Sequence, residues 1–300
     1  MDIHTQLERL INNADIPDDS IVVSENNKIV TISPRERIVS RIGNLANTKL
    51  RDDPHDLSYS HTAAWLAGDV APTVKPLHES PIISGEYVIS HYPLLNNKAR
   101  LNASRAAEIF AMTRDLGSAL PVVEAGMTLR KIDISGYVQE RIDHMTDNPA
   151  YDQELVHYIN SQIQTMQQTS PFHQLTQADR ALIHGDLKAD NVVIDSDGSL
   201  KTIDLDAVAV GPRLYDLASW RLRSEMGDAA PMEEVANVGR KSEIWNEDAY
   251  RALIGWKAIS SMSFTLRYES PDVHQAKIAH IAHSATSLGG LTAKPATTDN

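Results

Sequence analysis

The sequence of 300 residues contains no cysteine, which excludes disulfide bridges, thiolate metal sites and a cysteine nucleophile. No stretch approaches about 18 consecutive apolar residues, so the sequence predicts no membrane-spanning helix. The first residues lack a basic segment that leads into an apolar one, so no signal peptide is expected. These absences together predict a soluble, cytoplasmic protein.

Positive charge is also scarce. Lys and Arg number 28 against 40 Asp and Glu, which gives a net charge of -12. This balance disfavours nucleic acid and anionic membranes as partners and favours cationic ligands. The hydrophobic share of 42% and the charged share of 23% are ordinary for a globular protein. The length allows one large domain or two modest ones with ample core.

One stretch concentrates groups that can do chemistry. A His-Gly-Asp triplet ends at Asp186, and four residues separate this Asp from Asn191. The apolar run that follows predicts a buried strand, Asp195–Gly198 is typical of a hairpin turn, and a second strand leads to Asp204 and Asp206. Three carboxylates and one amide therefore converge around a hairpin. This layout suits proton abstraction from a hydroxyl beside a polyphosphate and Mg²⁺.

Each polar residue of this stretch has an expected role. Asp186 lies where a base would accept the proton of a substrate hydroxyl. Asn191 and Asp204 offer oxygen ligands for Mg²⁺, and Asp206, expected on the same strand face as Asp204, would bind the metal through water or orient Asp204. Lys188 could reach the transferred phosphoryl group. Singly, each residue could equally be a turn residue or a solvated strand end; jointly, their spacing favours the functional interpretation.

The N-terminal part predicts a small antiparallel sheet, with strands at 20–23, 28–32 and 36–42. Its first turn lacks a Gly-rich loop, so backbone N–H groups and the side chains of Ser24, Asn26 and Asn27 would have to hold any phosphates there. Arg41 on the third strand is either a cation that reaches inward to phosphates or a surface Arg at a strand end.

The remaining elements are mainly helical. A helix at 56–67 would turn His61 inward as a structural residue, and a strand at 86–90 would stop at His91-Tyr92-Pro93. A further helix is expected after residue 212. Apolar periodicity predicts helices at 3–13, 101–116, 135–146 and 151–168, and further helices are expected at 176–182, 247–267 and 272–287.

The segment from His184 to Asn191, followed by residues 203–206 (Ile-Asp-Leu-Asp), resembles the aminoglycoside phosphotransferase and choline kinase superfamily. Gly185 stands where protein kinases usually carry Arg, which points to the small-molecule branch. Residues 211–218 also resemble the family's segment after the metal-binding Asp.

The resemblance implies an α+β, bilobal, protein-kinase-like fold with a small antiparallel β-sheet lobe that contains one helix and a larger, mainly helical lobe. The expected division is 1–92 for the nucleotide-binding lobe, 93–288 for the catalytic and substrate-binding lobe, and 289–300 for a disordered tail.

Carried onto this sequence, the resemblance implies that Asp186 is the catalytic base and that Asn191 and Asp204 bind Mg²⁺. Asp216 would hold the catalytic loop through its backbone. Residues 86–94, which include Ser90 and Tyr92, would form the hinge on which the nucleobase rests. Arg41 would replace the family's ATP-binding lysine, yet the helix at 56–67 offers no Glu to pair with it.

The expected function is phosphoryl transfer from ATP, or GTP, with Mg²⁺, to a hydroxyl of a small molecule. An amino-bearing acceptor (amino sugar, aminoglycoside or amino alcohol) is favoured because acidic residues cluster after residue 212, although these could form a solvated helix face. The alternative is a nucleotide-binding pseudokinase, suggested by Arg41 and the missing Glu. A protein kinase is disfavoured because Gly-rich, Asp-Phe-Gly and Ala-Pro-Glu motifs are absent. The acidic residues are Asp216, Glu225, Asp228, Glu233 and Glu234.

Overall fold

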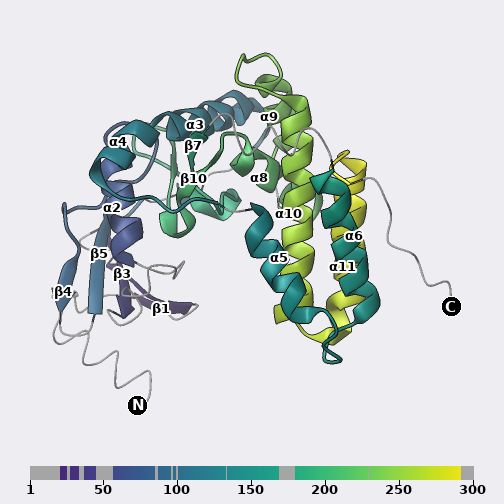
Figure 1. Ribbon diagram of the computed structural model, residues 1–300. Helices are drawn as coiled ribbons and strands as arrows, with labels where there is room; N and C mark the ends of the chain where they lie inside the picture. Colours follow the sequence, from purple (N-terminus) through teal and green to yellow (C-terminus); the bar gives the residue numbers. More distant parts are fainter. Residues whose placement is uncertain are drawn as a thin grey trace.

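The chain folds into two parts, a small β-sheet with one helix and a larger helical body (Figure 1). The computed structural model describes residues 21–25, 28–33, 37–44, 57–84, 87–95, 97–98, 101–132, 134–168, 180–228 and 230–291. The sheet has the order β1-β2-β3-β5-β4 with antiparallel neighbours. Its strands are β1 (Ile21–Glu25), β2 (Lys28–Ser33), β3 (Ile38–Asn44), β4 (Ile82–Ser84) and β5 (Tyr87–Pro93).

The three predicted N-terminal strands are confirmed, whereas the strand predicted to stop at residue 90 continues to Pro93. The backbone N–H of Leu94 donates to the carbonyl of Arg37 over 2.6 Å, so Pro93 occupies the neighbouring position, which makes no hydrogen bond to β3. On its other side, β4 pairs only with the beginning of β5. The missing N–H group of Pro93 therefore removes no hydrogen bond from the sheet.

Helix α10 (Glu247–Tyr268) forms the centre of the larger part, and neighbouring helices pack around it. Trp256 on this helix and Trp220 on α8 are fully buried. Because α10 is surrounded, apolar residues occur on most of its sides rather than along one stripe. The other helices are α3 (Ala106–Ser118), α4 (Leu120–Gly126), α5 (Ile134–Met145), α6 (Gln153–Gln167), α8 (Tyr215–Glu225), α9 (Met232–Gly239) and α11 (Pro271–Ser287).

Two small sheets lie between the N-terminal sheet and the helices. One pairs β6 with β8 and β9, and the other pairs β7 with β10. The prediction of a helix at 176–182 is wrong for its last residues, because residues 180–183 form β7 and pair with β10. Residues 176–179 lie outside the described residues. Short helices α4 and α9 were not predicted. The strands are β6 (Asn97–Lys98), β7 (Arg180–Ile183), β8 (Val192–Ile194), β9 (Leu200–Thr202) and β10 (Ala209–Pro212).

Helix α2 (Leu57–Ala67) confirms the predicted helix and packs between the sheet and the larger part. Strand β5 of the sheet ends at Pro93, and β6 pairs with β8 of the larger part. We propose that the boundary between the two parts lies close to the expected position, 92/93. Among the described residues, no helix is long and apolar enough to span a membrane.

The first residues of the segment expected to be a disordered tail, 289–300, are packed against the larger part. Gly290 and Leu291 are buried, because Gly255 on α10 has no side chain and lets the backbone of Gly290 approach closely. The predicted N-terminal helix at 3–13 and residues 292–300 lie outside the described residues.

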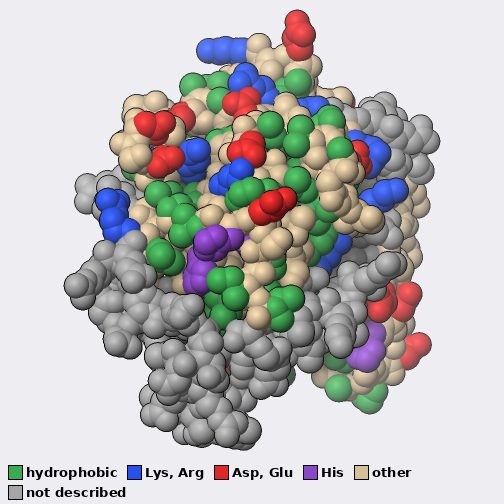
Figure 2. All heavy atoms as spheres, turned by 90° about the vertical axis from the view of Figure 1, so that its left-hand side faces the viewer, with side chains coloured by type: hydrophobic (Ala, Val, Ile, Leu, Met, Phe, Trp, Pro, Cys, Tyr) green, Lys and Arg blue, Asp and Glu red, His purple; other side chains and the backbone are tan. Residues whose placement is uncertain are grey.

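Figure 2 shows the face of the molecule that lies on the left-hand side of Figure 1, with apolar side chains exposed among charged ones. Strand β4 lies at one edge of the sheet, and Ile83 on it is 64% exposed. The strand is only 3 residues long, and a short edge strand offers little backbone for pairing with another chain.

Candidate active site

The loop that contains Asp186 is anchored from below by Asp216 at the start of α8. The Asp216 carboxylate accepts hydrogen bonds from the backbone N–H groups of His184 (2.7 Å) and Gly185 (2.9 Å). Burial raises the pKa of Asp216 above its ordinary value, while His184 and the two backbone hydrogen bonds oppose this rise. The His184 ring donates from Nε2 to the carbonyl of Ile203 over 2.8 Å. Both residues hold the loop through hydrogen bonds, which for Asp216 is the role that the resemblance implies.

Asp186 projects from this loop between two cations. Its Oδ1 accepts from Nη2 of Arg223, and its Oδ2 lies 3.2 Å from Nζ of Lys188. The amide nitrogen of Asn191 donates to the backbone carbonyl of Asp186 over 2.9 Å and so closes the turn. The side chain of Asp186 is 36% exposed, and an incoming molecule can therefore reach it.

Sequence reasoning did not identify Arg223, although a signal for it exists. Arg223 lies seven positions after Asp216 on α8, and residues at this spacing share one face of a helix. Because Asp216 faces the loop, Arg223 must face it as well. Its guanidinium thus belongs to the same site as Asp186.

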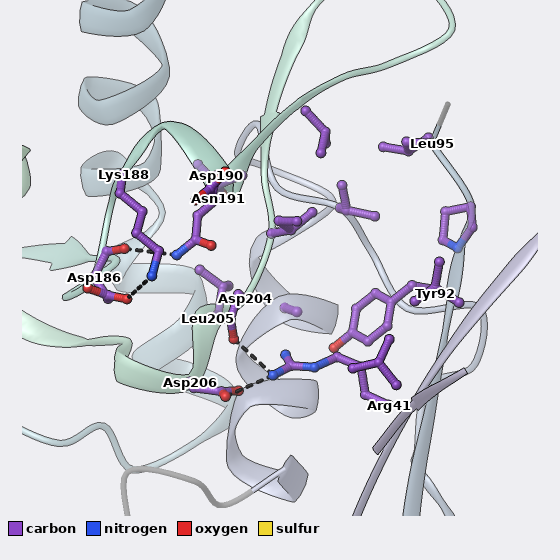
Figure 3. A pocket seen from close by; sticks show the side chains of 18 of the residues that line it. Arg41, Tyr92, Leu95, Asp186, Lys188, Asp190, Asn191, Asp204, Leu205 and Asp206 are labelled. Carbon is purple, nitrogen blue, oxygen red and sulfur yellow. Dashed lines mark hydrogen bonds and ion pairs between the residues drawn. The ribbon is translucent and has the colours of Figure 1, made fainter. Parts of the chain in front are cut away.

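Arg41 joins the small sheet to the other carboxylates of the site. Its Nη2 donates to Asp204 Oδ1 over 2.9 Å and to Asp206 Oδ2 over 2.8 Å (Figure 3). The two acids do not share a strand face as expected, because β9 ends at Thr202. Instead Asp204 has a left-handed backbone (φ 65°), and this bend begins a short 3₁₀ turn that presents Asp206 on the same side.

The predicted metal ligands fit a cation. Asp204 and Asp206 already share the guanidinium of Arg41, and both line one pocket with Asn191. The NH₂ group of Asn191 donates a hydrogen bond to the Asp186 carbonyl. The amide oxygen of Asn191 therefore remains to coordinate a metal ion. Two carboxylates and one amide oxygen are hard ligands suited to Mg²⁺. Within the described residues, no group of three or more His, Cys, Asp or Glu gathers as a metal site, so solvent or substrate oxygens would complete this one.

The pocket has a volume of about 730 Å³ and a polar floor opposite an apolar wall. Arg41, Asp186, Lys188 and the predicted metal ligands form the floor, and Tyr92 borders the pocket near Arg41 (Figure 3). Burial raises the pKa of Tyr92, which therefore remains a neutral phenol. The apolar wall includes Val30, Val39, Ala64, Val74, Leu94 and Leu95.

The other predicted nucleotide contacts are Ser90, Ser24 and Asn27. The Ser90 side chain is fully buried and bonds to His61 Nδ1 over 2.5 Å, so only its backbone can take part in the hinge. The side chain of Ser24, and Asn27 as a whole, lie outside the described residues.

His61 is buried on α2, the helix that offers no Glu partner for Arg41. Burial lowers its pKa, so it is neutral near pH 7, and its Nε2 donates to the carbonyl of His78 over 3.1 Å. His61 therefore links α2 to the sheet, and the carboxylates Asp204 and Asp206 act as the partners of Arg41.

A second cavity of about 540 Å³ opens on the α8 side of the loop. Lys188 and Asp190 line both cavities. The lining residues of the second are Lys188, Ala189, Asp190, Arg223, Met226, Gly227 and Asp228.

Most of the acidic residues expected to attract a cationic acceptor are engaged elsewhere. Glu225 and Glu233 both pair with Arg221 over 2.9 Å, and Asp216 is buried beneath the loop. Of the five predicted acids, Asp228 is the one that lines the second cavity, where it accepts from the Ala189 N–H over 3.3 Å.

Residues 62–253 match the phosphotransferase enzyme family, whereas no curated protein sequence matches the chain. The fold is similar to that of the GDP complex of aminoglycoside 2'-phosphotransferase-IIIa (TM-score 0.66, 13% identity, 95% of this chain and 98% of that chain). It is also similar to amicoumacin kinase in complex with AMP-PNP, Ca²⁺ and Ami (0.66, 14%, 96% and 94%). Choline kinase LicA from Streptococcus pneumoniae is a third similar structure (0.61, 13%, 95% and 98%). These likenesses confirm the predicted bilobal, protein-kinase-like fold.

Proposed function

The chain belongs to the phosphotransferase enzyme family, and from this membership we propose that it transfers the γ-phosphoryl group of ATP or GTP to a hydroxyl of a small, amino-bearing molecule. The observation that carries the proposal is the convergence of Asp186, Asn191, Asp204 and Arg41 on one pocket. These groups come from both parts of the fold, and phosphoryl transfer needs such a constellation of positioned charges.

In the proposed reaction, the acceptor hydroxyl lies against Asp186 and its oxygen attacks the γ-phosphorus of the nucleotide. The bond from this phosphorus to the β,γ-bridging oxygen breaks, and the nucleoside diphosphate leaves. The hydroxyl proton passes to a carboxylate oxygen of Asp186. Lys188, 3.2 Å from that carboxylate, neutralises charge on the transferred group.

The nucleotide would occupy the larger pocket, with its base at the hinge beside Tyr92 and its phosphates toward the polar floor. Arg41 would exchange one of its carboxylate contacts for phosphate oxygens, because its planar guanidinium can serve both. A magnesium ion held by Asn191 and Asp204, with Asp206, would neutralise charge on the polyphosphate.

An amino-bearing acceptor is supported by the second cavity, where Asp190 and Asp228 contribute carboxylates beside Lys188 and Arg223, the two cations that contact Asp186. The cavity volume of about 540 Å³ lies in the range that small-molecule sites occupy. The alternative, a pseudokinase, was suggested by the lack of a Glu partner for Arg41. The ion pairs to Asp204 and Asp206 give Arg41 its anionic partners and weaken that argument.

The test is ADP release with ATP and Mg²⁺ over a panel of amino sugars, aminoglycosides and amino alcohols, with Asp186→Asn alongside. We expect turnover with at least one acceptor and a loss of about 10²-fold or more in kcat for the variant. Equal rates for wild type and variant on every acceptor would remove Asp186 as the base. Calorimetry without binding of ATP and Mg²⁺ would overturn the nucleotide assignment, and binding without turnover would favour the pseudokinase.

A further inference from the structure

Two arginines on α8 have contrasting surroundings. Arg221 faces α9 and pairs with two carboxylates, Glu225 and Glu233. Arg223, two positions later, faces the catalytic loop, and in the described part of the chain its ion-pair partner is Asp186. Arg221 is therefore a structural cation with its own acids, whereas Arg223 depends on the proposed catalytic base for its negative partner.

This dependence creates a conflict during the proposed reaction. Asp186 has to turn an oxygen to the acceptor hydroxyl and take up its proton, after which the carboxyl is neutral. Arg223 would then keep its positive charge with its partner neutralised, in a site where its side chain is only 28% exposed. A partly buried guanidinium without an anion is unfavourable. A second anion in the cavity would remove the conflict.

The second cavity is where such an anion would bind. Arg223 and Lys188 both line it, and both contact Asp186, so two cations border the space beside the acceptor hydroxyl. A guanidinium presents a planar fork of donors that matches the oxygens of a carboxylate or a phosphate. The carboxylates Asp190 and Asp228 line the same cavity, and they suit the ammonium group proposed above.

We propose that Arg223 is a specificity-determining residue and that the acceptor carries an oxyanion, a carboxylate or a phosphate, close to the hydroxyl that is phosphorylated. The acceptor is then zwitterionic rather than simply cationic. Its anion takes over Arg223 and frees an oxygen of Asp186 for the hydroxyl. This inference rests on the proposed function and defines its substrate class.

The experiment compares acceptors in matched pairs that differ in the anion. L-serine with L-serinamide and L-threonine with L-threoninamide test the carboxylate, and glucosamine 6-phosphate with glucosamine tests the phosphate. Phosphorylation is followed by ADP release and mass spectrometry, for wild type, Arg223→Gln and Arg223→Lys. The control is Arg180→Gln, which removes an exposed arginine at the start of β7 that pairs with Glu124 on α4.

The expected result is a kcat/KM about ten- to hundredfold higher for the anionic member of at least one pair in wild type, the range that hydrogen bonds to charged groups span. Arg223→Gln should abolish this ratio, Arg223→Lys should restore part of it, and Arg180→Gln should leave it unchanged. If Arg223 merely positions Asp186, Arg223→Gln will lower both members of a pair equally, and the inference fails.

Other outcomes separate this inference from the proposed function. Phosphorylation of neutral members at rates equal to or above those of their anionic partners would sustain the function and overturn the inference. If no acceptor is turned over, calorimetry on enzyme loaded with AMP-PNP and Mg²⁺ decides. The inference is supported if an anionic member binds more tightly than its neutral partner and Arg223→Gln abolishes this difference. Equal binding of the two members, or no binding, overturns the inference. Failure to bind ATP at all would reject the proposed function itself.

Discussion

The backbone of Gly185 lies directly against the carbonyl of Ala207, and no side chain fits between them. A Cβ atom at Gly185 would overlap the Ala207 oxygen, and Gly185 has a left-handed backbone (φ +82°). The loop that presents Asp186 and the turn that presents Asp206 are therefore packed backbone to backbone. This contact explains physically why glycine precedes Asp186 in this chain.

The first prediction follows from this contact. Gly185→Ala should lower the free energy of unfolding by about 2 kcal/mol or more and reduce activity, because the loop must move away from Ala207. Gly198→Ala is the matched control, since Gly198 has a similar φ of +86° but nothing lies within 4 Å of its added Cβ. It should cost only about 1 kcal/mol and leave kcat unchanged. Urea unfolding measures the stability of each variant, and ADP release measures its activity. Equal effects of the two variants would contradict the steric argument.

A second prediction concerns Arg41 as the link between the two parts. Arg41→Met should reduce kcat/KM for ATP by about 10²-fold, because it removes the cation that faces the phosphates and leaves Asp204 and Asp206 without their guanidinium. Arg41→Lys should recover only part of this loss, because an ammonium keeps the positive charge but lacks the planar fork of donors that could hold phosphate oxygens and a carboxylate together. Initial rates at varied ATP measure the effect. Full activity of Arg41→Met would exclude Arg41 from nucleotide binding.

The hairpin around the site could be predicted from sequence because its information is local. An apolar run, an Asp-Ser-Asp-Gly turn and a second apolar run fix β8 and β9 without distant contacts. The long helices α10 and α11 were predicted as well, at 247–267 and 272–287. The apolar run at 180–183 was mistaken for a helix end, because a buried strand this short has no distinctive period.

The ion pairs of the site could not be predicted from the sequence, because their partners are far apart in the chain. Arg41 was found as a candidate cation, but its pairing with Asp204 and Asp206 depends on how the sheet packs against the larger part. The pairing of Arg223 with Asp186 depends likewise on the placement of α8 under the loop. Tertiary packing also determines which acidic residues could bind a cationic acceptor, because Arg221 forms ion pairs with Glu225 and Glu233, two of the five acids predicted for that role.

A third prediction uses the pKa of Glu247 at the start of α10. Burial alone would raise this pKa, but hydrogen bonds from Arg240, Trp245 and Arg251 lower it from 4.5 to about 2. Because the pKa is lower in the folded state, the stabilisation is complete above about pH 4.5 and is lost as the pH falls toward 2. Glu247→Gln should therefore cost about 1 kcal/mol at pH 7, after allowance for solvent screening, and less below pH 4.5.

Urea unfolding of wild type and Glu247→Gln at pH 7, 5, 4 and 3 measures this difference. Glu234→Gln on neighbouring α9 is the control, because Glu234 is exposed, and it should change stability by less than about 0.5 kcal/mol at every pH. A difference between wild type and Glu247→Gln that stays constant from pH 7 to pH 3 would show that the carboxylate is not stabilised by its three donors.

A fourth prediction tests the oxygen ligands of the site. Asp204→Asn and Asn191→Ala should each raise the Mg²⁺ concentration for half-maximal ADP release by about tenfold or more, because Asp204→Asn removes a negative charge from the ligand set and Asn191→Ala removes an oxygen ligand. Asp204→Asn also weakens the contact to Arg41, so a second readout is needed: Mn²⁺ binding to enzyme loaded with AMP-PNP, followed by electron paramagnetic resonance. Asp195→Asn, in the hairpin turn and paired with Lys201, should leave both readouts unchanged. If Asn191→Ala and Asp204→Asn alter neither the Mg²⁺ dependence nor Mn²⁺ binding, the metal must be held by other groups, and the carboxylates beside Arg41 serve only to position that arginine.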